Sequence, residues 1–174
     1  MADVAAASQQ YLTFALAGEE YALPILRVRE ILEYDTVTHV PTTPPFIRGV
    51  MNLRGSVVPV IDLELKLGIG ETAVTRRTCI VVVELPHPGD GAHDGEVFVV
   101  GLMAEAVNEV IDLAASEIVP PPEFGTPVRM EFLRGLGKTG KKFVLVLDID
   151  RVMSTYEMVA VSSLSQPEAA GEGA

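Results

Sequence analysis

Short runs of alternating apolar and polar residues fill most of this chain. Leu12, Phe14 and Leu16 share one face of an extended segment, which is the pattern of a half-buried β-strand. Residues 77–85 form a β-branched run instead and predict a buried strand. The same reasoning predicts further strands at 11–16, 21–23, 57–61, 96–103, 107–113, 130–136 and 143–147.

Helical signals are short. Residues 62–67 predict one brief helix that two following glycines end. Residues 25–32 leave two interpretations open: a helix with Ile25, Val28 and Leu32 on one face, or a turn of helix that leads into a strand. Many short strands, frequent turns and no long amphipathic helix together predict an all-β, or mainly β, barrel or sandwich.

The composition bounds the class of protein. The 174 residues suffice for one ordinary domain or two small subdomains. Hydrophobic residues make up 48% of the chain without any tryptophan, so the core must be mainly aliphatic. A net charge of −11 opposes binding to nucleic acid or to anionic lipid. No apolar stretch approaches the roughly 20 residues of a membrane helix, and no basic leader precedes residue 27, so we expect a cytoplasmic protein without membrane insertion.

Two segments resemble sites that bind phosphate or metal. Residues 135–142 nearly match the phosphate loop GxxxxGK[ST], but Lys142 stands where a hydroxyl must reach magnesium. A strand rather than a helix is predicted after it, so we interpret it as a basic hairpin turn. The loop at 86–95 contains two histidines and two aspartates, yet its glycines deny the rigid geometry that a metal site needs. We therefore expect no cofactor and no metal.

Three single residues could belong to a catalytic site. Asp62 and Asp148 each end a Val/Ile-rich strand, but neither has a neighbouring nucleophile or histidine, so we interpret both as helix N-caps. Cys79 lies alone in an apolar run and is predicted to pack as a small hydrophobe. The absence of a complete catalytic set disfavours an enzyme and favours an adaptor.

The chain is arranged around residues 41–63, which read PTTPPFIRGVMNLRGSVVPVIDL. Three prolines stiffen the start of this segment, and Gly49 and Gly55 mark turns or close approaches of the backbone. Arg54 lies in apolar surroundings, where a guanidinium must pair with a carboxylate or face a partner. Pro59 predicts an edge strand because proline cannot donate to a sheet ladder.

This segment resembles the core signature of the CheW-like chemotaxis coupling proteins. The matching pattern is Pro-x-x-Pro-x-Phe-Ile-x-Gly-Val-x-Asn-Leu-Arg-Gly-x-Val-x-Pro-Val-Ile-Asp-Leu, with further matches at 18–31, 120–124 and 132–137. Small polar residues without periodicity predict flexible ends at 1–10 and 161–174. The CheW-like domain is therefore predicted at 11–160.

The resemblance implies a more specific fold than the pattern alone. It implies two small five-stranded β-barrels packed side by side, with a short helix near the C-terminus at 149–153. The first barrel would span about 21–85, and the second about 96–147 together with the strand at 11–16.

The resemblance also implies a function. A CheW-like protein would be a non-catalytic adaptor that couples transmembrane chemoreceptors to a CheA-type histidine kinase in bacterial chemotaxis. Its partners would be the regulatory domain of the kinase and the cytoplasmic tips of methyl-accepting chemoreceptors. It would be a monomer in isolation, recruited from the cytoplasm to membrane-associated receptor arrays. An adaptor of another chemosensory pathway and a small-ligand-binding β-barrel are the alternatives.

Two interaction surfaces follow from the resemblance. The receptor groove would include Val28, Glu30, Gly49, Asn52, Arg54 and Cys79. The kinase surface would include Val37, Thr38, His39, Val40 and Ile69. We expect Glu30 to hold Arg54 in a bidentate pair that orients the guanidinium toward the receptor.

Overall fold

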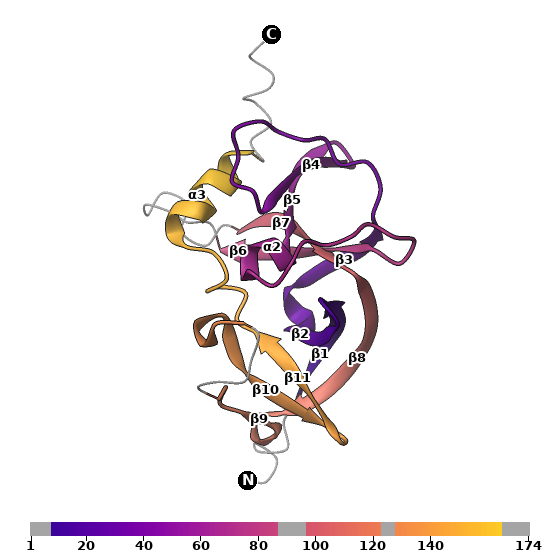
Figure 1. Ribbon diagram of the computed structural model, residues 1–174, viewed down its shortest axis with the longest axis vertical. Helices are drawn as coiled ribbons and strands as arrows, with labels where there is room; N and C mark the ends of the chain where they lie inside the picture. Colours follow the sequence, from indigo (N-terminus) through magenta and orange to yellow (C-terminus); the bar gives the residue numbers. More distant parts are fainter. Residues whose placement is uncertain (1–7, 87–96, 123–127, 165–174) are drawn as a thin grey trace.

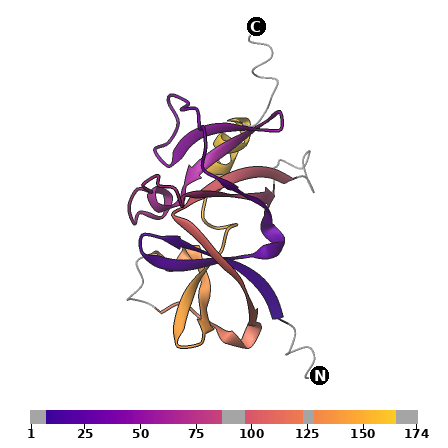
Figure 2. The ribbon, with the colours of Figure 1, turned by 90° about the vertical axis from the view of Figure 1, so that its right-hand side faces the viewer.

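The computed structural model describes residues 8–86, 97–122 and 128–164. Most of these residues lie in two mixed β-sheets that follow one another along the long axis of the molecule (Figure 1, Figure 2). The six-stranded sheet, in the order β8-β1-β2-β11-β10-β9, is formed by β1 (Ser8–Leu16), β2 (Glu19–Pro24), β8 (Ala106–Ala114), β9 (Ile118–Val119), β10 (Leu133–Thr139) and β11 (Lys142–Leu147). The five-stranded sheet, in the order β3-β6-β7-β5-β4, is formed by β3 (Val28–Glu33), β4 (Ile47–Leu53), β5 (Ser56–Asp62), β6 (Cys79–Pro86) and β7 (Val97–Ala104).

The described helices are short. The 3₁₀ turn η1 (Ile25–Arg27) leads into β3, so the second of the two interpretations of residues 25–32 is right. The predicted helix at 62–67 is confirmed as α2 (Leu63–Leu67), which ends at Gly68 with φ 75°. Further 3₁₀ turns are η2 (Ala115–Glu117) and η3 (Met130–Phe132), and η3 replaces the first residues of the strand predicted at 130–136.

The C-terminal helix lies further along the chain than predicted. We expected it at 149–153, but α3 spans Thr155–Leu164. The physical reason is a capping box: the Ser154 Oγ accepts the Glu157 N–H at 3.1 Å, and the Glu157 Oε1 accepts the Ser154 N–H at 2.8 Å. The helix packs against β5 (Figure 1).

The mainly β class is confirmed, but the two sheets are not closed barrels. β8 and β9 are the free edges of one sheet, and β3 and β4 are the edges of the other. The outer edge of β4 is occupied by the segment before it, because Thr38 and Val50 exchange two backbone hydrogen bonds of 2.8 and 2.9 Å. The bridge occupies the backbone N–H and C=O of Val50. β4 would need such groups to pair with the opposite edge, β3, and close the sheet.

Two strands, β2 and β7, belong to a different sheet from the one that we predicted. β2 falls within the predicted first unit at 21–85 but pairs with β1 in the six-stranded sheet. A tight turn at Ala17 and Gly18, with φ of 49° and 82°, makes this hairpin local. β7 falls within the predicted second unit, but it pairs with β6 over their full lengths in the five-stranded sheet.

Pro59 lies in an interior strand, which contradicts the predicted edge position. β5 lies between β7 and β4. Val50, opposite Pro59, directs its N–H and C=O to Thr38, so this is a non-hydrogen-bonded pair and the proline nitrogen points away from β4. The parallel ladder to β7 begins only at Val60, so no ladder bond is lost.

The two sheets share one core. The largest buried cluster combines Phe14 and Leu23 of the six-stranded sheet with Val81 and Val100 of the five-stranded sheet. Smaller clusters lie within each sheet: Val60, Ile80, Val82 and Met103 form that of the five-stranded sheet. This common core fixes the surfaces that both sheets present.

Candidate functional site

The β4–β5 hairpin presents Arg54 at its tip. Leu53 pairs with Ser56, and the two residues between them, Arg54 and Gly55, have φ of 52° and 90°. Positive φ at both positions is the geometry of a type I′ turn, which an arginine rarely adopts. The Gly55 N–H donates to the Asn52 Oδ1 at 2.8 Å and stabilises the turn. The signature Asn-Leu-Arg-Gly is therefore a turn that holds an arginine in a strained conformation.

Glu30 of β3 holds this arginine. The Arg54 Nη1 and Nη2 donate to the Glu30 Oε2 and Oε1, each at 2.8 Å, so the predicted bidentate pair is confirmed. The Arg54 side chain is 70% exposed and the Glu30 side chain 23%. The hydrogen bond from Arg54 lowers the pKa of Glu30, and the same bond raises the pKa of Arg54. The guanidinium is thus fixed in orientation while it stays accessible to a partner.

Gly49 is a point of close approach. A Cβ at this position would overlap the carbonyl oxygen of Thr38, and its φ is 152°. Val37, the residue before Thr38, packs against the smaller buried cluster within the five-stranded sheet. The predicted kinase segment at 37–40 therefore lies beside β4, which carries the predicted receptor residues Gly49 and Asn52.

The other predicted receptor residues lie apart from this corner. Val28 packs against the core between the sheets, and the register of β3 shifts between Val28 and Glu30. Cys79 is partly buried at the start of β6, and its Sγ donates to the Arg77 carbonyl at 3.3 Å. The structure thus gathers Glu30, Asn52 and Arg54 at one corner but not Val28.

The predicted kinase residues also lie in two separate places. Val37 and Thr38 run antiparallel beside the outer edge of β4, and the Val40 carbonyl accepts the Thr43 hydroxyl at 2.9 Å. His39 is exposed. Ile69 instead follows α2 and packs against the core between the sheets. A cavity of about 380 Å³ connects the two predicted surfaces; it is lined by Leu32, Glu33, Asp35, Thr36, Thr38, Met51 and Asn52. Sequence reasoning missed most of its lining, because the chain brings β3 and β4 together only in the fold.

Asp62, at the end of β5, is a buried carboxylate that accepts hydrogen bonds from several segments. Its Oδ1 accepts the backbone N–H groups of Glu64 and Leu65, so its predicted N-cap role is confirmed. Its Oδ2 accepts the Arg48 Nη2 at 2.9 Å and the Thr72 N–H at 3.0 Å. The side chain has no solvent exposure, so this network ties β4, β5 and the loop after α2 together. The N-cap role predicted for Asp148 is wrong, since no helix follows it directly.

The other features noted in the sequence are a basic turn and a histidine-containing loop. The basic turn is confirmed, because β10 and β11 form a hairpin around Gly140, at φ 66°. The histidine-containing loop predicted at 86–95 lies almost entirely outside the described residues. Among those that are described, no cluster of histidine, cysteine and carboxylate side chains could hold a metal ion. No helix in the same part of the chain is long and apolar enough to span a membrane.

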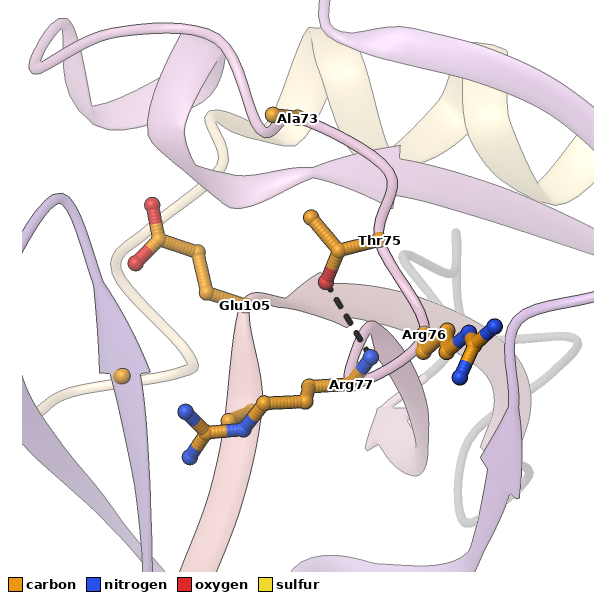
Figure 3. A pocket seen from close by; sticks show the side chains of 7 residues that line it. Ala73, Thr75, Arg76, Arg77 and Glu105 are labelled. Atoms are coloured by element: carbon orange, nitrogen blue, oxygen red, sulfur yellow. Dashed lines mark hydrogen bonds between the residues drawn. The ribbon is translucent and has the colours of Figure 1, made fainter.

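A second cavity lies where the two sheets meet, and sequence reasoning did not find it. It measures about 650 Å³ and is lined by Ala15, Ala73, Thr75, Arg76, Arg77, Glu105 and Ala106. Figure 3 shows that the Arg76 and Arg77 side chains extend in opposite directions from their loop, with Glu105 beside them. These residues come from three separate segments of the chain, so no local pattern in the sequence signals the cavity.

Known proteins resemble this chain in sequence and in fold. The CheW-like domain family matches residues 10–157. This chain belongs to that family. Chemotaxis protein CheW of Klebsiella aerogenes is 37% identical over 91% of this chain and 89% of its own, and the probable chemotaxis protein CheW of Rhizobium etli is 29% identical over 87% and 92%. The crystal structure of the scaffolding protein TtCheW from Thermoanaerobacter tengcongensis aligns with a TM-score of 0.73 and 32% identity, over 87% of this chain and 91% of that one. The chain is a non-catalytic chemotaxis scaffold of the CheW type.

Proposed function

We propose that this CheW-type scaffold acts in the cytoplasm, where it couples the tips of methyl-accepting chemoreceptors to the regulatory domain of a CheA-type histidine kinase. The observation that supports this most is the Glu30–Arg54 pair. An exposed guanidinium that is held by two hydrogen bonds on a strained turn is prepared to bind an acceptor on a partner with little loss of side-chain freedom.

The receptor surface is centred on this corner. Glu30, Asn52 and Arg54 present polar groups there, while Gly49, which lacks a Cβ, leaves room for the Thr38 carbonyl beside the strand. Val28 and Cys79 belong to this surface only if the receptor extends from the corner along β3 and β6, which carry them.

The kinase surface is centred on residues 37–40. Val40 is partly buried and His39 is exposed, so a partner can cover both without unfolding the segment. Since this segment pairs with the outer edge of β4, the two partners would bind adjacent surfaces of one rigid unit. Such adjacency is what an adaptor needs in order to hold receptor and kinase in a fixed relation.

Affinity capture from the native lysate tests this proposal. The tagged full-length chain should retain a CheA-type kinase together with chemoreceptors, identified by mass spectrometry. The Arg54→Glu variant should retain the kinase and lose the receptors. Capture of neither partner by the unmodified chain would contradict the proposed function, and loss of both by the variant would contradict separate surfaces.

A further inference from the structure

The loop between α2 and β6 carries two adjacent arginines that have no partner in the fold. Arg76 and Arg77 are both exposed, and neither side chain forms an ion pair or a hydrogen bond with any residue that the structure describes. The chain has 24 acidic residues and 13 basic ones, so carboxylates with which they could pair are in excess. Two guanidiniums that nevertheless stay unpaired are free to bind an acceptor on another protein.

Hydrogen bonds within this loop fix the backbone that carries the arginines. The Thr78 Oγ1 accepts the Thr75 N–H at 2.8 Å and donates to the Ala73 carbonyl at 3.2 Å. The Thr75 Oγ1 accepts the Arg77 N–H at 3.1 Å (Figure 3). The Thr78 carbonyl accepts the Tyr34 N–H at 3.0 Å, which ties the loop to the residue after β3. A partner that binds Arg77 therefore has no need to order the loop first.

Arg77 borders the cavity of about 650 Å³ where the two sheets meet. Its side chain extends toward the side of the loop on which Glu105 lies, whereas Arg76 extends the opposite way (Figure 3). Ala15 of β1 and Ala106 of β8 line the cavity as well, and their small side chains leave room for a side chain of a partner. Glu105 is partly buried and Arg77 is exposed, so the guanidinium is the more accessible of the two charged groups.

The cavity lies next to the proposed receptor surface. Cys79 begins β6, and its Sγ donates to the Arg77 carbonyl at 3.3 Å. Cys79 pairs with Glu33 of β3. Glu33 is three residues beyond Glu30, or roughly 10 Å along the strand. A receptor that follows β3 and β6 from the Arg54 corner to Cys79 therefore reaches Arg77.

We propose that Arg77 is a specificity-determining residue of the receptor surface, which binds a carboxylate side chain of the chemoreceptor at the cavity between the two sheets. This inference rests on the proposed function, because it names the chemistry of the receptor that the scaffold selects. A guanidinium can donate two parallel hydrogen bonds to a carboxylate. The net charge of −11 repels acidic groups elsewhere, so an acidic receptor residue gains affinity only where it meets an unpaired cation. A receptor with a basic residue at this point is rejected by Arg77.

Titration calorimetry of the full-length chain tests the proposal, with a purified tip fragment of a chemoreceptor that the tagged chain retains from the lysate. Arg77→Glu should weaken binding about 10-fold, because it places like charges together. Its melting temperature should stay unchanged, since the Arg77 side chain has no contact to lose. Arg76→Glu is the matched control: it makes the same charge change on the same loop, but its side chain extends away from Glu105 (Figure 3). It should keep most of the affinity, and an equal loss in both variants would overturn the proposal.

Salt dependence and a second variant test the charge at the cavity itself. Raising the salt from about 0.1 M to about 1 M shortens the Debye length from about 10 Å to about 3 Å, so it should weaken the unmodified chain more than Arg77→Ala. Glu105→Gln removes the negative charge beside the proposed carboxylate and should strengthen receptor binding about 3-fold. General damage to the fold would weaken binding instead. Equal salt dependence of Arg77→Ala and the unmodified chain, or unchanged or weaker binding by Glu105→Gln, would contradict the proposed contact.

Arg54→Glu separates this inference from the proposed function. Loss of receptor binding by Arg54→Glu, together with normal binding by Arg77→Glu, would overturn the inference and leave the proposed function intact. A chain that binds no receptor fragment even without a substitution would overturn both. Kinase binding should be the same in the unmodified chain and in Arg77→Glu, because Arg77 lies outside the proposed kinase segment at 37–40, and its loss would contradict a role specific to the receptor.

Discussion

Arg54 and Glu30 lie at opposite edges of the five-stranded sheet, yet their side chains meet in two hydrogen bonds of 2.8 Å. β3 carries the glutamate, and the turn after β4 carries the arginine. The pair therefore bridges the sheet at the gap that its backbone ladder leaves open. An accessible salt bridge adds little to stability, so we assign its role to the orientation of the guanidinium.

Charge reversal at Arg54 should separate receptor binding from folding. We expect Arg54→Glu to weaken receptor binding about 30-fold or more, as for a hot-spot residue, with little change in melting temperature and unchanged kinase binding. Titration calorimetry with each purified partner measures the affinities. Arg129→Glu is the matched control, since Arg129 is also about 70% exposed in an ion pair, and it should have no effect.

Reversal of both charges tests whether the pairing itself matters. Glu30→Arg combined with Arg54→Glu should recover part of the receptor affinity, because the bidentate geometry can form again with its charges exchanged. Receptor binding as weak in the double variant as in Arg54→Glu would show that the sign of the charge at residue 54 decides binding, and not its orientation.

Gly49→Ala should disturb both proposed surfaces. The added methyl group overlaps the Thr38 carbonyl, so we expect a loss of about 2–4 kcal/mol in the free energy of unfolding. Gly18→Ala also places alanine at positive φ but meets no atom within 4 Å, and should cost about 1–2 kcal/mol. Urea unfolding compares the two. Equal losses would show that backbone strain, and not the contact with Thr38, dominates at Gly49.

Asp62→Ala should be among the most damaging single changes. It removes the carboxylate that pairs with Arg48, which keeps only the Thr72 carbonyl as acceptor, and it leaves the buried Thr72 N–H without an acceptor. This should cost about 3–5 kcal/mol. Asp148→Ala is the control, because the Asp148 carboxylate forms a long ion pair of 3.7 Å with Arg151. This variant should lower the free energy of unfolding by about 1 kcal/mol or less. Equal denaturant midpoints for the two variants would contradict the structural role assigned to Asp62.

A charge at Val40 should weaken the kinase contact. We expect Val40→Glu to cost about 2 kcal/mol or more in kinase binding if this residue is an interface anchor, with receptor binding retained. Val74→Glu places the same charge on a valine that is 49% exposed in another loop and serves as the control. Normal kinase binding by a folded Val40→Glu protein would move the kinase surface elsewhere.

Features set by neighbouring residues could be derived from the sequence alone. The strand predicted at 11–16 is confirmed by β1, although residues 11–14 are all buried and do not alternate with exposed ones. The cap predicted at Asp62 is confirmed at the start of α2. Such features depend on contacts a few residues apart, so the local pattern contains the information. The Ser-x-x-Glu signal of α3 was local as well, and it would have corrected the predicted position of that helix.

Arg54 was marked by its surroundings, and the family resemblance supplied its partner Glu30, but only the tertiary structure brings the two together. The tertiary structure likewise decided the sheet to which β2 and β7 belong, and the open edges in place of barrels. Pro59 shows why the sequence alone does not decide this. A proline lacks an N–H, and this excludes it from an interior strand only where the sheet needs a hydrogen bond from that N–H. That requirement is set by Val50 and Thr38, which pair with each other across an intervening loop. Contacts between distant segments depend on which competing pairs bury the most apolar surface and satisfy the most backbone groups, and no local pattern records that competition.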